Sequence, residues 1–136
     1  MPRLYREVPL NSIWEGSGNV MCLDVLRAME RGPEAVEAFF AEVDLARGAD
    51  RRLDAFVGRV REALGDFAAI ETRARRIVEH MALALQGSLL VRHGDPAVAD
   101  AFLSSRLAGD HGLAFGTLPA GVDFVRIIER ARPAVG

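Results

Sequence analysis

A short segment near the start of the chain, Trp14-Glu15-Gly16-Ser17-Gly18-Asn19, combines residue types that could do chemistry. Glu15 is a carboxylate, which can serve as a general base. The two glycines that follow it allow a positive φ angle and a close approach of backbone to a ligand. A helix is expected to begin directly after them, so that its unpaired N–H groups point to the same place and favour an anion. The segment therefore predicts one half of a cofactor site.

Each of these residues also has a purely structural interpretation. Glu15 could be a solvent-facing acid ahead of a helix, and the glycines after it could serve turn geometry alone. Trp14 fits a packing anchor better than a side chain that stacks on a cofactor. Arg27 lies one helical turn after Asp24, and this spacing is typical of a surface ion pair. The residue types alone leave both interpretations open.

Other reactive residues give no pattern of a site. His80, His93 and His111 have no cysteine or histidine at ligand spacing, so no metal site is predicted. Cys22, the single cysteine, is expected to be a buried thiol on a helix. It rules out an internal disulfide and fits the reducing cytoplasm. Ser104-Ser105 has no neighbouring histidine or acid that would make a nucleophile.

The composition is that of one globular domain. The chain has 136 residues, half of them apolar, and a net charge of −2, which gives no overall attraction to nucleic acid or anionic lipid. No apolar run approaches the roughly 20 residues that cross a bilayer, so no membrane association is expected. Residues 47–76 carry eight arginines but also five acids. We interpret them as a solvated face with pairs such as Glu71–Arg75, and a phosphate-binding stripe is the alternative.

Hydrophobic periodicity predicts an all-α bundle of five or six helices after an N-terminal loop at residues 1–18. The clearest amphipathic stripe lies between Leu53 and Leu64, in a helix capped by Asp50. The longest predicted helix becomes apolar nearly all round, so it should be central, and Gly87-Ser88 inside it should allow a close helix crossing. The predicted helices cover residues 19–31, 33–47, 51–64, 67–92, 96–107 and 122–131.

The N-terminal motif resembles a known family. The run Arg6-Glu7-x-Pro9-x-Asn11-Ser12-Ile13-Trp14-Glu15-Gly16-Ser17-Gly18-Asn19-Val20 is similar to the region before the final bundle helix of FAD-dependent acyl-CoA dehydrogenases. The following Leu23 to Arg27, and the later segments Asp95 to Leu107 and Phe115 to Pro119, look like the adaptive-response (AidB-type, DNA-alkylation-response) branch of that family. The strong resemblance covers residues 5–31.

The resemblance implies roles for individual residues. Glu15 would be the catalytic base that removes the α-proton of an acyl-CoA thioester while a hydride leaves to FAD. Trp14 and Arg27 would lie at the substrate pocket. The residues expected to contact FAD follow the base directly: Gly16, Ser17, Gly18 and Asn19.

The resemblance also implies a division of the chain. Residues 1–31 would be the end of the dehydrogenase C-terminal bundle, and residues 32–136 a helical extension. The expected partners are acyl-CoA in the complete protein, a second copy of the chain in a homo-oligomer and, weakly, DNA. The alternative function is a helical DNA-binding or oligomerisation module. The apolar face at Leu26 and Met29 should either fold back on the extension or drive self-association.

We expect the chain by itself to retain no FAD and to be inactive. The resemblance implies that most flavin contacts of the family come from segments outside this sequence. Association costs about 4–15 kcal/mol of lost translational and rotational freedom, which the few remaining contacts cannot offset. The measurement is visible flavin absorbance of the purified chain after gel filtration with added FAD. A yellow protein with stoichiometric flavin would contradict the prediction.

Overall fold

The computed structural model describes residues 2–14, 16–66, 68–114 and 116–133. Within these ranges the regular secondary structure is all helical and includes no strand, which confirms the predicted all-α class. The α-helices are α1 (Pro2–Glu7), α2 (Gly18–Arg31), α3 (Pro33–Val43), α4 (Arg51–Gly65), α5 (Ala74–His93), α6 (Pro96–Phe102) and α7 (Phe124–Ala131). The short elements are the 3₁₀ turns η1 (Val8–Ser12), η2 (Asp44–Ala46) and η3 (Ile70–Arg73), and the π-helical turn η4 (Leu103–Leu107).

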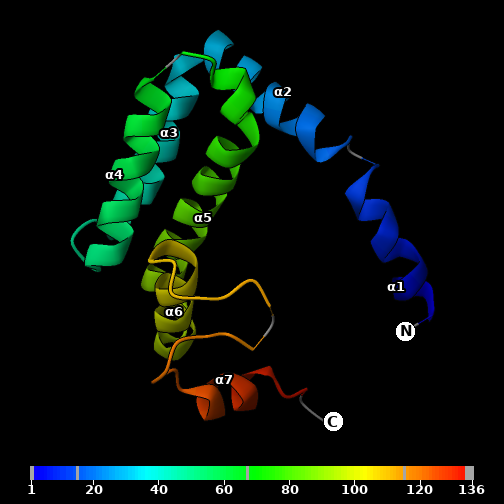
Figure 1. The fold of residues 1–136 in the computed structure, drawn as a ribbon, viewed down its shortest axis with the longest axis vertical. Helices are drawn as coiled ribbons and strands as arrows, with labels where there is room; N and C mark the ends of the chain where they lie inside the picture. The colour runs from blue at the N-terminus through cyan, green and yellow to red at the C-terminus, as the bar shows by residue number, and fades with distance from the viewer. Residues whose placement is uncertain (1, 15, 67, 115, 134–136) are drawn as a thin grey trace.

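Helix α5 is the centre of the bundle, as its apolar second half predicts. It contacts α2, α3, α4 and α6. Helices α3, α4 and α5 run side by side, α6 packs along one end of α5, and α2 leads away from the other end towards α1 (Figure 1). None of the described helices is both long and apolar enough to span a bilayer.

Helix α4 buries the stripe that its sequence predicts. Its N-terminus is capped by the carboxylate of Asp50, which accepts a hydrogen bond of 2.7 Å from the N–H of Arg52. One face of the helix then enters the core, because its apolar residues recur at helical spacing. The buried residues are Leu53, Phe56, Val57, Val60 and Leu64.

The close crossing predicted at Gly87-Ser88 is confirmed. A Cβ atom on Gly87 would lie 3.0 Å from Cδ1 of Leu107 and 3.1 Å from Cδ1 of Leu53, so only glycine fits without displacing neighbours. The hydroxyl of the fully buried Ser88 donates a hydrogen bond of 3.1 Å to the carbonyl of Val43, at the end of α3. This pair of small residues lets α5 touch three other elements at once.

The predicted N-terminal loop at residues 1–18 is wrong over most of its length. Residues 2–12 form α1 and η1 instead. Prolines sit at the starts of both elements, where a missing N–H is tolerated, and Arg3 forms an ion pair of 3.0 Å with Glu7 one turn later. No described residue between 2 and 14 is buried, so this segment is helical through local interactions alone.

The predicted helix 67–92 begins seven residues later, at Ala74. Asp66 accepts a hydrogen bond of 3.0 Å from the N–H of Ala68 and starts a turn. Ala69 has φ of 50°, in the left-handed region that interrupts a helix, and the turn η3 follows it. The apolar spacing continues across this interruption, since Ile70 still packs against the core. Periodicity therefore could not locate the break.

We expect Gly87→Val to lower the free energy of unfolding by about 1–3 kcal/mol, because it overpacks the contact with Leu53 and Leu107. The matched control is Gly58→Val in the middle of α4, where an added Cβ meets nothing within 4 Å. That exposed change should stay within about 0.5 kcal/mol of the unchanged chain. Urea unfolding followed by circular dichroism measures both. Equal effects of the two variants would contradict the close crossing.

Candidate functional site

The predicted cofactor segment leads into the first turn of α2. Glu15 lies outside the described residues, so its role stays a prediction. Gly16, directly after it, has φ of 104°, a conformation that favours glycine. Its N–H donates a hydrogen bond of 3.0 Å to the carbonyl of Ile13. Turn geometry thus accounts for this glycine, and the same turn brings the chain to the exposed end of a helix.

The N-terminus of α2 presents free hydrogen-bonding groups. Ser17 is the N-cap residue in an extended conformation, and its hydroxyl makes no capping bond. The first helical bond runs from the N–H of Met21 to the carbonyl of Ser17, at 3.1 Å. The N–H groups of Gly18, Asn19 and Val20 precede this bond and have no acceptor within the helix. Such a helix end carries partial positive charge and suits an anion.

Arg75 of α5 adds a full positive charge beside this helix end. Its Nη2 atom lies 3.6 Å from the position that a Cβ on Gly18 would take. The predicted pair of Arg75 with Glu71 is not among the ion pairs of the described residues, because residues 70–73 form a 3₁₀ turn instead of a continuous α-helical turn. Nothing in the local sequence spacing indicates the neighbourhood of Gly18 and Arg75, which depends on how α2 packs on α5.

The two residues expected at the substrate pocket lie apart from each other. Trp14 is 63% exposed, so its interpretation as a packing anchor is wrong for this chain. Arg27 forms an ion pair with Asp24 at 2.5 Å, which confirms the structural interpretation of this residue. It lies on α2 about 13.5 Å along the helix axis from Gly18, since an α-helix rises 1.5 Å per residue. Among the site residues described, Gly16, Ser17, Gly18 and Asn19 adjoin one another, and Arg27 is remote from them.

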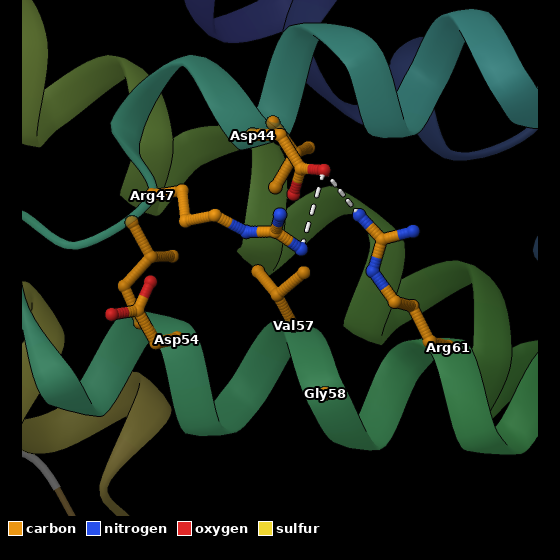
Figure 2. Close-up of a pocket in the computed structure, with 8 residues that line it drawn as sticks. Asp44, Arg47, Asp54, Val57, Gly58 and Arg61 are labelled. Carbon is orange, nitrogen blue, oxygen red and sulfur yellow. Dashed lines mark hydrogen bonds and ion pairs between the residues drawn. The ribbon is translucent and has the colours of Figure 1, made fainter.

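A hollow of about 370 Å³ lies between the end of α3 and α4 (Figure 2). The Oδ2 atom of Asp44 lies 2.6 Å from Nη2 of Arg61 and 3.8 Å from Nη2 of Arg47. The Arg61 guanidinium also stacks 4.0 Å from the ring centre of Phe40. Asp54 accepts a backbone N–H bond of 3.1 Å from the turn before α4. Two arginines and two aspartates balance in charge, so the cluster ties two helices together and offers no excess charge to a ligand.

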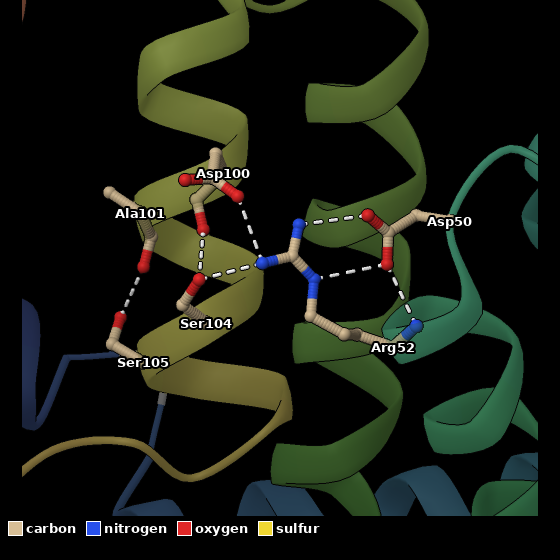
Figure 3. Close-up of polar contacts among 6 residues, drawn as sticks. All are labelled: Asp50, Arg52, Asp100, Ala101, Ser104 and Ser105. Atoms are coloured by element: carbon tan, nitrogen blue, oxygen red, sulfur yellow. Dashed lines mark hydrogen bonds and ion pairs between the residues drawn. The ribbon is translucent and has the colours of Figure 1, made fainter. Parts of the chain in front are cut away.

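Another polar cluster centres on Arg52 at the start of α4 (Figure 3). Its guanidinium lies 2.8 Å from the Asp50 carboxylate and 2.9 Å from Asp100 of α6, and it donates a bond of 2.7 Å to the hydroxyl of Ser104. The hydrogen bond from Arg52 holds the pKa of Asp50 below its ordinary value. The Arg52 guanidinium thus reaches Asp50 next to it and both Asp100 and Ser104 on the other side, so we interpret this cluster as a clamp between α4 and the α6 region.

The arginines of residues 47–76 are largely engaged with the chain's own acids and backbone. Four of them pair with aspartates: Arg47, Arg52, Arg61 and Arg73. Arg59 donates a bond of 3.1 Å to the carbonyl of Leu107 and lies over the ring of Phe56. The interpretation of these residues as an ion-paired face is confirmed for the four that pair.

The remaining reactive side chains do not assemble. Within the described ranges, no three of the His, Cys, Asp and Glu residues come together as a metal-binding group. His80 packs edge-on against Phe56, and burial together with Arg76 lowers the pKa of its imidazole. Cys22 is half-buried. The described residues thus define an all-helical protein in which the uncapped start of α2 lies beside the guanidinium of Arg75.

Comparison with known proteins relates this chain to one enzyme family. It is 38% identical over 102 residues to AidB of Escherichia coli (strain K12), which is named as one of the acyl-CoA dehydrogenases, and the match covers 75% of this chain and 18% of AidB. It is 29% identical over 120 residues to acyl-CoA dehydrogenase family member 11 of Caenorhabditis elegans, covering 74% of this chain and 19% of that protein. No family model and no solved structure matches. The chain is thus similar to proteins of the acyl-CoA dehydrogenase family, and it spans about one fifth of the length of each of these two relatives.

We expect Arg52→Ala to lower the free energy of unfolding by about 1–3 kcal/mol, because it leaves the Asp50 carboxylate without its charged partner. The pKa of Asp50 is lower in the folded state than in the unfolded state. The clamp therefore stabilises the fold fully at pH values above the unfolded-state pKa, and this stabilisation is lost as the pH falls through the folded-state pKa. The difference in the free energy of unfolding between Arg52→Ala and the unchanged chain should therefore become smaller as the pH falls. Thermal unfolding across pH measures it.

The control for this prediction is Arg51→Ala. Arg51 is the exposed neighbour of Arg52 and forms no ion pair with any described residue. This variant should change the free energy of unfolding by less than about 0.5 kcal/mol. A loss in Arg51→Ala as large as that in Arg52→Ala would contradict the clamp.

Proposed function

We propose that this chain supplies part of the active site of an FAD-dependent acyl-CoA dehydrogenase-like protein. Residues 1–31 would be the active-site loop and last bundle helix, and residues 32–136 a helical extension. The observation that supports this most is the 38% identity to AidB over three quarters of the chain. The whole reaction is the α,β-dehydrogenation of an acyl-CoA thioester, with Glu15 as the base.

The start of α2 fits one edge of a flavin dinucleotide. Gly18 and Asn19 offer free N–H groups, Ser17 an uncommitted hydroxyl, and Arg75 a guanidinium beside them. These donors suit the pyrophosphate or another electron-rich edge of FAD. When bound, FAD supplies the capacity to accept a hydride. An exposed edge of this kind cannot enclose FAD without further protein surface. This requirement agrees with a chain that matches about one fifth of the length of each relative.

Glu15 would move the proton in this reaction. A glutamate on the loop before α2 would take the α-proton of the thioester while the hydride leaves from the β-carbon. Its basicity must approach neutrality for this task, and exclusion of water raises the pKa of a carboxyl group. Trp14 is well placed to exclude water once another surface covers it, because its indole is 63% exposed in the chain alone. We therefore propose that the isolated chain is inactive.

Oligomerisation is a second candidate function, and the exposed apolar surface favours it. Eight large apolar side chains between residues 4 and 21 are at least 47% exposed. Such surfaces mark sites of interaction with other proteins. DNA binding has less support, because a phosphate-binding stripe needs uncommitted cations and four of the arginines between residues 47 and 76 pair with aspartates.

A chimera tests the enzymatic proposal. The matched segment of AidB is replaced by this chain, and flavin absorbance and acyl-CoA-dependent bleaching of that absorbance are compared with intact AidB. We expect the chimera to equal AidB in flavin content. Glu15→Gln in the chimera should keep the flavin and lose bleaching by at least about 100-fold, the usual contribution of a general base.

The control variant in the chimera is Glu7→Gln, on α1 and within the same N-terminal segment. It should bleach like the unchanged chimera. If the unchanged chimera shows acyl-CoA-dependent bleaching of the flavin and the Glu15→Gln chimera still shows it, the role of Glu15 is overturned. A separate readout, loss of flavin in Arg75→Glu but not in Arg76→Glu, tests the proposed edge at α2.

A further inference from the structure

A short turn at residues 68–73, named here the pre-α5 turn, lies directly before α5. Its sequence, Ala-Ala-Ile-Glu-Thr-Arg, contains neither glycine nor proline, so nothing in its composition stops a helix. Ala69 nevertheless has φ of 50°, a left-handed conformation that its Cβ atom makes unfavourable. The turn therefore exists against the preference of its own residues, and particular contacts must maintain it.

Arg73 maintains the pre-α5 turn. Its Nη2 atom donates hydrogen bonds of 2.6 Å to the carbonyl of Asp66 and 3.1 Å to the carbonyl of Ala68, and it lies 3.1 Å from Oδ2 of Asp66. In a continuous α-helix these two carbonyls would accept bonds from N–H groups four residues later. The N–H of Thr72 instead donates to the carbonyl of Ala69, at 3.0 Å. Arg73 thus takes the place of the helical donors.

The turn separates two neighbouring charges. Arg75 lies beside Gly18, in the first turn of α2. Glu71 instead lines a groove beside Leu26 and Glu30, in the second half of the same helix. A continuous α-helix would place Glu71 one turn before Arg75, which is the favoured order for an ion pair at this spacing. The pre-α5 turn therefore keeps a carboxylate away from the cation that it would otherwise neutralise.

We propose that Arg73 is a positioning residue for the site at the start of α2. By holding the pre-α5 turn, it keeps Glu71 away and leaves the Arg75 guanidinium to face an anionic group at the free N–H groups of that helix end. This inference rests on the proposed function, in which the anionic group is part of FAD. It also gives residues 32–136 a task at the site, because Arg73 and Arg75 both belong to the helical extension.

Hydrogen exchange in the 136-residue chain tests the turn without any ligand. In Arg73→Ala the helix should extend across the pre-α5 turn, so the amides of residues 70–73 should exchange at least about tenfold more slowly than in the unchanged chain. Ala69→Gly removes the penalty of the left-handed conformation, so the turn should remain and these amides should keep their fast exchange. Equal or faster exchange in Arg73→Ala would overturn the role of Arg73.

The dissociation constant of FAD in the AidB chimera tests the link to Arg75. Arg73→Ala should raise this constant roughly tenfold, as the loss of one charge-assisted hydrogen bond does. Glu71→Gln removes the competing carboxylate, so it should restore binding in the Arg73→Ala background, yet change the constant less than about twofold by itself. A loss that Glu71→Gln does not rescue is purely structural and overturns the proposal. The matched control is Arg76→Ala, at an exposed position of α5, and it should leave the constant unchanged.

A second variant covers the case in which Arg73→Ala does not fold. Ala69→Val keeps Arg73 but disfavours the left-handed turn, because a β-branched side chain is poorly tolerated there, and it should weaken FAD binding with the same rescue. If Arg75→Ala leaves FAD binding unchanged, the proposed edge at α2 is overturned together with this inference. If Arg75→Ala weakens binding but neither Arg73→Ala nor Ala69→Val does, the positioning role alone is overturned.

Discussion

The close approach of α5 to its neighbours at Gly87-Ser88 is the constraint on which the rest of the bundle depends. Without a side chain at Gly87, the methyl groups of Leu53 and Leu107 reach the backbone of α5 from two directions. The buried hydroxyl of Ser88 donates its hydrogen bond to the carbonyl of Val43. Because α3, α4 and the π-helical turn all meet α5 at one level, their remaining apolar side chains fill a single core.

The polar frame around this core is built from arginine, which is the only basic residue type other than histidine in the chain. Arg52 and Arg61 each reach aspartates on other elements, and Arg59 reaches a carbonyl at the end of the π-helical turn. A guanidinium can pair with an acid and stack on an aromatic ring at the same time, as Arg61 does with Asp44 and Phe40. Three of the eight arginines of residues 47–76, Arg52, Arg59 and Arg61, thus join separate elements of the fold.

Helix α2 connects the core to the candidate site. Its last turn packs near the core through Met29, while its first turn is exposed beside Arg75 of α5. The position of Arg75 at that end therefore follows from the packing of α2 on α5. This links stability to the proposed function: a change that shifts α2 on α5 would also displace the cation from the free N–H groups of Gly18 and Asn19.

Much of the fold is determined by local sequence. The five-residue stripe of α4, the cap at Asp50 and the stops at Gly32 and Gly94 are recognisable because caps and apolar spacing act over one or two turns. The motif at Trp14 to Asn19 likewise shows its resemblance to acyl-CoA dehydrogenases in the sequence alone, since its residues are consecutive. The Arg27–Asp24 pair needs only one turn of helix to form.

Only the tertiary structure decided the rest. The turn at Ala69 cuts a helix that periodicity extends to Phe67, because the apolar spacing continues across the left-handed residue and gives no signal of the break. The placement of Arg75 beside Gly18, the clamp from Arg52 to Asp100 and the groove beside Leu26 all join residues far apart in the sequence. Their proximity depends on how the helices cross, and crossing is set by the fit of side chains on both helices together.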